Sequence, residues 1–242
     1  MKGKSILVTG GARRIGREIG LVMAAAGADV AFTYLSSAQD ARRTLAALRA
    51  RGVRALALRC DVRNEKSATA ALRRVEAEFG GLDVLINNAG AYDTIDFEKI
   101  TIRQWDDMFA INTRGPFLMS RLAAPLLRVR KGRIINIGSL GGLRPWASHA
   151  HYCSSKAALM MLTEVTAKAL APEISVNCVS PGMISSGNSE ATAFLRHVAH
   201  KTPMRRAGTP AEVAAAVMFF ASGPHFITGQ VLGVDGGLGL ES

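Results

Sequence analysis

The feature that most constrains this chain is the alternation of short apolar runs with helix-length segments along its whole length. Apolar, β-branched runs are typical of strands buried on both faces, and strands that alternate with helices pair in parallel through right-handed crossovers. The pattern predicts an α/β fold with a doubly wound, seven-stranded parallel sheet flanked by helices. The expected strands are Ser5–Thr9, Asp29–Tyr34, Val53–Arg59, Asp83–Asn87, Arg133–Ile137, Ile174–Val179 and Gln230–Val234, and the expected helices include Arg14–Ala26, Ala38–Ala50, Glu65–Phe79 and Thr101–Leu127.

The length and composition fit one domain over residues 1–242. A chain of 242 residues that is 48% hydrophobic can bury one sizeable core. No apolar stretch approaches the eighteen residues of a membrane span, and the first residues do not resemble a leader, so we expect no membrane contact and a cytoplasmic location. Cys60, Cys153 and Cys178 lack metal-ligand spacing, so we expect reduced, structural cysteines and no metal site.

The charge is strongly basic, with 30 Lys and Arg against 19 Asp and Glu and a net charge of +11. Such a balance suits a polyanionic partner. The basic residues are spread along the chain, however, with one dense cluster at Arg128–Lys131 and no basic tail with interleaved aromatic residues. We therefore expect a solvated basic surface rather than nucleic-acid binding, with an acidic partner or a phosphorylated ligand as the alternative.

A glycine-rich turn follows the first strand, in the stretch "VTGGARRIGREIG". Gly10, Gly11 and Gly16 place backbone N–H groups and the positive end of a helix where a pyrophosphate could bind. The spacing departs from G-x-G-x-x-G because Arg14 stands between the glycines. We expect Arg14 to keep a backbone conformation acceptable for an L-residue and to point its guanidinium outward. A simple turn at a helix start remains the alternative.

The end of the second strand bears on the choice of dinucleotide. Enzymes that prefer NAD usually carry an acidic residue there, whose carboxylate binds the ribose hydroxyls and repels a 2′-phosphate. Here the strand ends "FTYLSS", with no acid before Asp40. The hydroxyls of Tyr34, Ser36 and Ser37, with the cations of Arg13 and Arg14, form a predicted nest for a 2′-phosphate. The prediction is NADP(H) in preference to NAD(H), with surface arginines as the alternative.

A second set of residues suits hydride-transfer chemistry. Tyr152 and Lys156 are four residues apart in a helical run and share one face, and Ser139 ends the strand before them. A free phenol has a pKa of about 10, and a nearby ammonium such as that of Lys156 should lower it. Tyr152 would then give a proton to a carbonyl oxygen while a nicotinamide delivers hydride, with Ser139 bonded to the same oxygen.

These stretches resemble the short-chain dehydrogenase/reductase family. "TGGARRIG", "NNAG", "INTRGPF", "YCSSK", "SVNCVSPG" and "ITGQVLGVDGGL" match its motifs over nearly the whole chain, and arginine at position 14 is common in its pteridine-reductase-like branch. The resemblance implies a single-domain Rossmann fold and an NADP(H)-dependent oxidoreductase that interconverts a carbonyl and an alcohol. It also implies a homotetramer assembled through the segments Thr101–Leu127 and His151–Ala169.

The resemblance also implies roles for individual residues. Lys156 would bind the nicotinamide ribose, Asn112 would support a proton relay through water, Asp61 would bind adenine, and Ser186 stands where relatives often have threonine. The implied catalytic residues are Asn112, Ser139, Tyr152 and Lys156, and the implied cofactor-binding residues are Gly10, Arg13, Arg14, Ile15, Gly16, Tyr34, Ser36, Ser37, Asp61, Val62, Asn88, Ala89, Gly90, Tyr152, Lys156, Pro181, Gly182 and Ile184.

The substrate is left open between classes. The leading expectation is a 3-oxoacyl-[acyl-carrier-protein] reductase, whose acidic partner would suit Arg128, Arg130 and Lys131, although Glu173 stands where those reductases are commonly basic. The alternatives are a pteridine- or dihydrofolate-type reductase, which often has aspartate in place of Ser139, and a non-enzymatic NADP-sensing regulator. Candidate substrate-wall residues are Tyr92, Leu140, Trp146, His149 and the range 183–194, within a segment, 181–210, expected to form a lid.

Overall fold

The computed structural model, which describes residues 1–185 and 199–240, contains one seven-stranded sheet. The strand order is β3-β2-β1-β4-β5-β6-β7, and every neighbouring pair is parallel. This confirms the predicted fold class, and each expected strand is present with ends shifted by at most a few residues. The strands are β1 (Ser5–Val8), β2 (Asp29–Tyr34), β3 (Ala55–Arg59), β4 (Val84–Asn87), β5 (Arg133–Ile137), β6 (Ser175–Pro181) and β7 (Val231–Val234).

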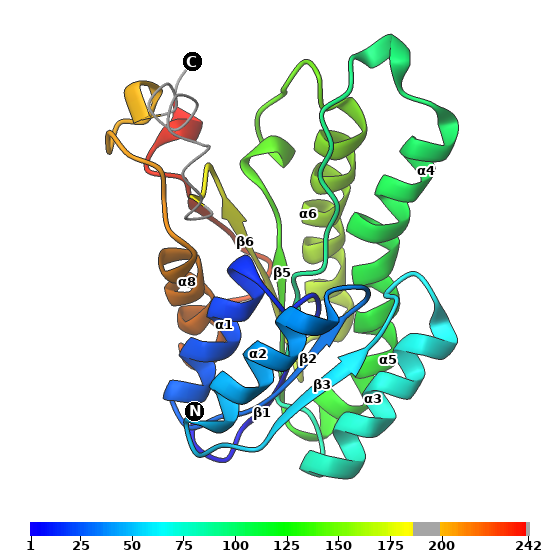
Figure 1. The fold of residues 1–242 in the computed structure, drawn as a ribbon, viewed down its shortest axis with the longest axis vertical. Helices are drawn as coiled ribbons and strands as arrows, with labels where there is room; N and C mark the ends of the chain where they lie inside the picture. The colour runs from blue at the N-terminus through cyan, green and yellow to red at the C-terminus, as the bar shows by residue number, and fades with distance from the viewer. Residues whose placement is uncertain (186–198, 241–242) are drawn as a thin grey trace.

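Helices cover both faces of the sheet (Figure 1). One face is packed by α1 (Arg14–Ala25), α2 (Ala38–Arg49) and α8 (Pro210–Ser222), and the other by α3 (Glu65–Phe79), α5 (Gly115–Val129) and α6 (Ala150–Leu170). Neighbouring residues of one strand enter opposite cores: Ile6 and Val8 pack in the first cluster and Leu7 in the second. Burial on both sides explains why the strands are continuously apolar.

The predicted long helix Thr101–Leu127 is not continuous. The structure divides it into α4 (Ile102–Phe109), a π-helical turn at Ala110–Arg114, and α5. Thr101 and Gln104 form the predicted capping box at the start of α4. The π turn inserts an extra residue where Asn112 turns inward to the loop after β4, so a tertiary contact overrides the helical period.

The carboxyl ends of the strands form the upper edge of the sheet in Figure 1, and the amino ends form the lower edge. The strand order reverses between β1 and β4, which is the position where open parallel sheets bind ligands. Cys60, Cys153 and Cys178 are free thiols. Among the described residues, no helix is long and apolar enough to span a bilayer, and no cluster of His, Cys, Asp and Glu could hold a metal ion.

Candidate active site

The glycine turn after β1 is bonded to the loop that follows β4. Thr9 Oγ1 accepts hydrogen bonds from the backbone N–H groups of Asn88 and Ala89, each at 2.9 Å. The Asn88 side-chain amide donates to the carbonyls of Thr9 (2.9 Å) and Gly10 (3.0 Å). A Cβ on Gly10, whose φ is +65°, would lie 2.9 Å from Ala89 Cα. The chain's own packing therefore requires glycine here, before any ligand is considered.

The backbone of Arg14 differs from the expectation. Its φ is +51°, in the left-handed region, whereas the sequence predicted a conformation comfortable for an L-residue. Arg13 before it is extended and occupies the N-cap position of α1. The left-handed conformation costs a non-glycine residue about 1–2 kcal/mol, because Cβ approaches a carbonyl oxygen. The turn therefore keeps the geometry that suits glycine while carrying an exposed cation.

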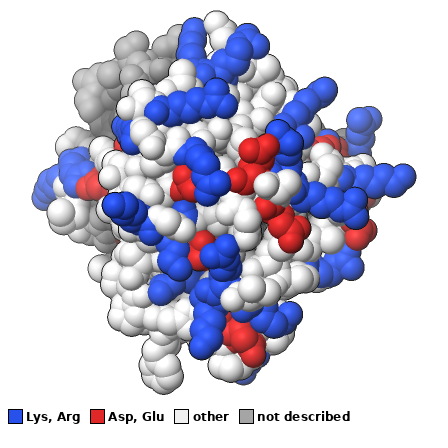
Figure 2. All heavy atoms as spheres, turned by 90° about the horizontal axis from the view of Figure 1, so that it is seen from below, with Lys and Arg blue, Asp and Glu red and all other residues white. Residues whose placement is uncertain are grey.

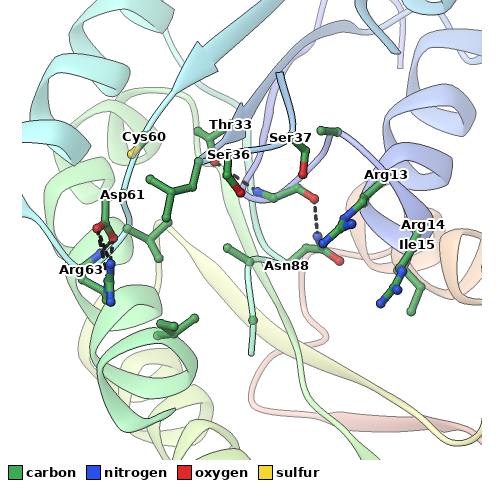
Figure 3. Close-up of a pocket in the computed structure, with 18 residues that line it drawn as sticks. Arg13, Arg14, Ile15, Thr33, Ser36, Ser37, Cys60, Asp61, Arg63 and Asn88 are labelled. Atoms are coloured by element: carbon green, nitrogen blue, oxygen red, sulfur yellow. Dashed lines mark hydrogen bonds and ion pairs between the residues drawn. The ribbon is translucent and has the colours of Figure 1, made fainter. Parts of the chain in front are cut away.

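A cavity of about 500 Å³ lies over the carboxyl ends of β1, β2 and β4 (Figure 3). Arg13 and Arg14 lie at one end of it, and Asp61 with Arg63 at the other, as Figure 3 shows. The cofactor residues predicted from the sequence that line this cavity are Gly10, Arg13, Arg14, Ile15, Gly16, Ser36, Ser37, Asp61, Val62, Asn88, Ala89 and Gly90.

Tyr34 is an exception among the predicted cofactor residues. It is not among the residues that line the cavity, and its ring packs against the core between the sheet and α1 and α2. Successive residues of a strand face opposite sides, so Thr33 and Leu35 line the cavity in its place. This alternation was visible in the sequence and would have placed Thr33 in the site.

Arg63 is a cavity residue that the sequence analysis missed. Its guanidinium donates to the Asp61 carboxylate at 3.0 Å (Nε to Oδ1) and 2.8 Å (Nη2 to Oδ2). The hydrogen bonds from Arg63 lower the pKa of Asp61, outweighing the effect of burial. The carboxylate is thus ionised and partly engaged, and Arg63 adds a second cationic end to the cavity.

A second cavity of about 400 Å³ adjoins the first and shares Ile15, Asn88 and Gly90 with it, so the two form one cleft. Of the residues singled out from the sequence, it is lined by Ser139, Tyr152, Lys156, Pro181, Gly182 and Ile184, together with Tyr92, Trp146 and Met183 of the substrate wall. Leu140 and His149 are not among its lining residues. Ser186 and most of the range 183–194 lie outside the described residues.

Ser139, Tyr152 and Lys156 converge at this second cavity. Ser139 follows β5 and its Oγ accepts a hydrogen bond from the Gly141 N–H at 3.1 Å. Tyr152 and Lys156 lie one turn apart on α6, and Lys156 Nζ donates to the carbonyl of Ile137 at 2.8 Å. Burial lowers the pKa of Lys156 to about 8, against an opposing effect of the Cys178 thiol. At neutral pH the ammonium is mostly ionised but can readily lose its proton.

The pKa of Tyr152 is opposite in direction to the expectation. Burial raises it above its ordinary value, and the hydrogen bond with Ser139 only partly opposes that rise. The phenol is largely enclosed beside Tyr92 and Trp146, where loss of water disfavours the phenolate. Tyr152 is therefore held in its protonated form, which is the form that can donate a proton.

Asn112 is fully buried and its side chain is engaged by the protein. Oδ1 accepts from the Ala91 N–H (2.8 Å), while Nδ2 donates to the Ala91 carbonyl (3.0 Å) and Ser155 Oγ (3.0 Å). A Cβ on Gly90 would lie 3.3 Å from Asn112 Oδ1 and 3.6 Å from Lys156 Nζ, so these groups are close together. The side chain joins the loop after β4 to α6, and the proton-relay role expected of Asn112 stays a prediction.

Aromatic side chains surround the Tyr152 ring. The Tyr92 ring meets it edge-on with centroids 5.0 Å apart, and the Trp146 ring is nearly parallel to it at 6.2 Å. His149 Nε2 is hydrogen-bonded to the Tyr92 hydroxyl (2.8 Å) and to Thr94 Oγ1 (3.0 Å). The loops after β4 and β5 are thereby joined into one aromatic wall, defined here as Tyr92, Trp146 and His149.

The segments after β6 and β7 brace each other. The Gly182 N–H donates to the Val234 carbonyl at 3.0 Å, and the Asp235 carboxylate accepts from the N–H groups of Gly237 (3.0 Å) and Gly239 (2.9 Å). A Cβ on Gly182 would lie 2.7 Å from Asp235 Cβ. The two motifs "SPG" and "DGG" thus position Pro181, Gly182 and Ile184 along the cleft.

Comparison with known proteins places the chain in a family. A family model described as Enoyl-(Acyl carrier protein) reductase matches residues 10–239. A 3-oxoacyl-[acyl-carrier-protein] reductase FabG of Staphylococcus aureus is 36% identical over 240 residues, covering 97% of this chain and 98% of the relative. A short-chain dehydrogenase/reductase structure from Serratia marcescens superposes with a TM-score of 0.93 at 37% identity, covering 98% of both chains. This chain belongs to the short-chain dehydrogenase/reductase family.

As a short-chain dehydrogenase/reductase, the protein is an oxidoreductase of CH–OH and C=O groups that uses a nicotinamide cofactor. A structure of NAD⁺-bound xylitol dehydrogenase is also similar, with a TM-score of 0.90 and 28% identity over 96% of this chain and 98% of the other. The fold alone therefore does not choose between phosphorylated and unphosphorylated cofactors. The cleft fits a dinucleotide, because glycine backbone and the start of α1 line one part and Ser139, Tyr152 and Lys156 line the other.

Proposed function

We propose that this protein is an NADP(H)-dependent carbonyl reductase, with residues 1–242 acting as one domain. The observation that carries the proposal is the shared cleft: Ser139, Tyr152 and Lys156 line its second cavity, and Arg13 and Arg14 line its first. The second cavity suits proton transfer to a carbonyl oxygen. The first suits a phosphorylated nucleotide.

The preference for NADP(H) is supported by the charges around the first cavity. Arg13 and Arg14 are exposed there beside Ser36 and Ser37, and no carboxylate follows β2 before Asp40. Asp61 is the one carboxylate among the described residues that line this cavity, and Arg63 engages it. A 2′-phosphate would therefore meet cations and hydroxyls at the Arg13 end.

The chemistry assigns one role to each side chain. The reduced nicotinamide, when bound, supplies hydride. Tyr152, kept protonated by burial, gives its proton to the carbonyl oxygen, and Ser139 donates a hydrogen bond to the same oxygen. Lys156, whose pKa is about 8, can give a proton to the Tyr152 phenolate and regain one from water in the cleft, and it would bind the nicotinamide ribose. Asn112 holds the loop and helix that carry these groups.

The leading substrate class is a 3-oxoacyl thioester, on the strength of the similarity to the 3-oxoacyl-[acyl-carrier-protein] reductases. Lys156 is the one cation among the described residues lining the second cavity, which suits a substrate that is neutral at its reactive end. The basic cluster Arg128–Lys131 lies at the amino ends of the strands, at the edge opposite Ser139. An acidic acyl carrier that docks there would not border the cleft of the same chain.

A second candidate substrate is a planar heteroaromatic ring, as in a pteridine- or dihydrofolate-type reductase. The aromatic wall favours it, because flat rings stack on Tyr92 and Trp146 with more contact than a flexible acyl chain makes. The retained Ser139 counts against it, because pteridine-type reductases often have aspartate at this position. A regulator that senses NADP without turnover is the third possibility.

The deciding experiment is a turnover screen with NADPH and NADH against an acetoacetyl thioester, a quinonoid dihydropterin and simple ketones. Tyr152→Phe should bind NADPH as the wild type does, and its turnover should fall by about 10²–10⁴-fold, because the proton donor is lost. Undiminished turnover would contradict the role given to Tyr152. NADPH binding without turnover of any carbonyl by the wild type would favour the regulator.

A further inference from the structure

A separate cavity opens at the lower edge of the sheet, at the amino ends of the strands. Its volume is about 310 Å³, within the range of small-molecule sites. Figure 2 views the molecule from this side and shows Lys and Arg side chains covering more of the face than Asp and Glu. We call this hollow the basal cavity; it is lined by Met1, Lys2, Lys4, Asp83, Val84, Arg130, Lys131, Arg133, Ala221 and Ser222.

The charges around the basal cavity are unbalanced. Lys2, Lys4, Arg130, Lys131 and Arg133 are cationic, and Asp83 is the one carboxylate among the described lining residues. Asp83 is already satisfied: it accepts from Lys4 Nζ at 2.9 Å and from the N–H and Oγ of Ser5 at 2.9 and 3.1 Å. Within the described chain, Lys2, Arg130, Lys131 and Arg133 form no ion pair.

The two guanidiniums are held in place by backbone carbonyls. Arg133 donates to Phe220 O (2.7 Å) and Gly223 O (2.8 Å), and Arg130 donates to Gly80 O (2.8 Å). Each guanidinium has five N–H donors, so several remain free. Burial also lowers the pKa of Arg133, because no carboxylate compensates its charge. A bound anion would relieve that imbalance without rearranging either side chain.

Lys131 adds a second, independent observation. Its φ is +48°, so it holds a left-handed conformation after the end of α5 at a position that glycine usually takes. A glycine here would avoid a cost of about 1–2 kcal/mol. Keeping a cation in a strained position beside other unpaired cations is typical of a functional site.

From this arrangement we propose that the basal cavity is a binding site for a small multivalent phosphate, distinct from the cofactor cleft. Fixed guanidiniums and mobile ammoniums together suit the several oxygens of a di- or triphosphate. The cavity lies at the amino ends of the strands, at the opposite edge of the sheet from Ser139, which follows the carboxyl end of β5. Binding there would add stability by mass action without touching the reacting groups.

The test is a calorimetric titration of the whole protein with inorganic tripolyphosphate, in the presence of enough NADP⁺ to fill the cofactor cleft. The wild type should bind one tripolyphosphate and show a raised Tm. Lys131→Gly removes one cation and its backbone strain together, so it should fold at least as stably and bind tripolyphosphate at least about tenfold more weakly.

Arg205→Gly is the matched control. Arg205 also has a left-handed backbone, with φ of +55°, carries the same charge and is not among the residues lining the basal cavity. It should bind tripolyphosphate as the wild type does. Equal affinities for wild type and Lys131→Gly, equal weakening by both variants, or no binding to the wild type would each overturn the proposal. None of these outcomes depends on carbonyl turnover.

Discussion

Arg14 shows how a single residue combines a strained, left-handed backbone with a positive charge at a binding site. The turn is shaped for glycine, since Gly10 and Gly16 pack against Ala89 and Asn88, and Arg14 between them has a left-handed backbone like that of Gly10. Lys156 lowers the stability of the fold in a second way, because its ammonium is buried and hydrogen-bonded to the carbonyl of Ile137. We therefore expect that replacing Arg14 weakens NADPH binding without lowering stability. Replacing Lys156 should abolish turnover and raise stability.

Replacing Arg14 by glycine tests the first case. Arg14→Gly should leave the free energy of unfolding unchanged or raise it by up to about 1 kcal/mol, since relief of strain offsets the added chain entropy of glycine. NADPH affinity should fall by about tenfold while NADH affinity stays nearly constant, because only the 2′-phosphate loses a cation. Urea unfolding and fluorescence titration measure the two effects. Equal weakening of NADPH and NADH would remove the specificity argument.

Replacing Lys156 by methionine tests the second case. With a folded pKa of about 8 against an ordinary 10.5, the cost of the buried charge is fully present below pH 8 and disappears by about pH 10.5. Wild-type stability should therefore rise relative to Lys156→Met across that window, by about 3 kcal/mol. At pH 7 the variant should be the more stable protein and should lack turnover.

The matched control for this comparison is Lys168→Met, at an exposed position on the same helix. Its stability should follow the wild type at every pH. Burial raises the pKa of Cys178 to about 11, and Lys156 partly opposes that rise, so Lys156→Met should raise the pKa of this thiol further. Up to about pH 10.5 the folded thiol stays mostly protonated in all three proteins, so the stability differences between them report on Lys156. A flat difference between wild type and Lys156→Met from pH 7 to 10.5 would show that the ammonium is not destabilised.

At the scale of elements, the segment from α4 to α5 shows how a tertiary contact changes a helix. The sequence predicts one helix there, and Thr101 begins it as expected. The π turn appears because the Asn112 amide bonds the backbone of Ala91 and the hydroxyl of Ser155. The helical periodicity of the sequence cannot predict those partners, because they are distant in sequence.

Asn112→Ala should therefore cost more than loss of a surface hydrogen bond. The change leaves the N–H and carbonyl of Ala91 without their partner in a partly buried setting and Ser155 Oγ without its donor in a buried one, at an expected cost of about 2–3 kcal/mol. Asn64→Ala, which removes the exposed N-cap of α3, should cost about 1 kcal/mol. Urea unfolding of both variants gives the comparison. A smaller loss for Asn112→Ala than for Asn64→Ala would contradict the bracing role.

Across the whole molecule, some large apolar side chains on α5 and α6 stay exposed after folding. Phe117 on α5 and Met161 and Val165 on α6 are 48%, 58% and 55% exposed. Met161 and Val165 are one turn apart and share a helix face. Exposed apolar patches of this kind mark protein–protein contacts. The homotetramer expected from the sequence stays a prediction, with this face as its expected contact.

Met161→Asp should dissociate the assembly, because it places a charge in the apolar contact. Light scattering should show a wild-type tetramer and a smaller species for the variant, with the helical circular-dichroism signal kept. Val129→Asp, at an 84% exposed position at the end of α5, should remain tetrameric. A wild-type protein that is monomeric at micromolar concentration would remove the prediction.

The fold and most of the cleft could be predicted from the sequence because both depend on local signals. Strand period, glycine turns and the four-residue spacing of Tyr152 and Lys156 are encoded within short windows. The face of β2 that meets the cavity followed from the same alternation once one residue of that strand was placed, whereas the part played by Arg63 and the direction of the Tyr152 pKa could not be assigned in this way. Each depends on which acid an arginine reaches or on how much water the aromatic wall excludes.

The parallel sheet, the edge at which the cleft forms and the side chains that could act there therefore follow from the amino-acid pattern alone. Only the tertiary structure decided that Arg14 is left-handed, that Asn112 serves as a brace, that Tyr152 stays protonated, and that five cations meet at the basal cavity. The physical reason is that the solvation and the hydrogen-bond partners of a side chain depend on its position in the folded protein. Residues that are far apart in the sequence form the surroundings of that position together.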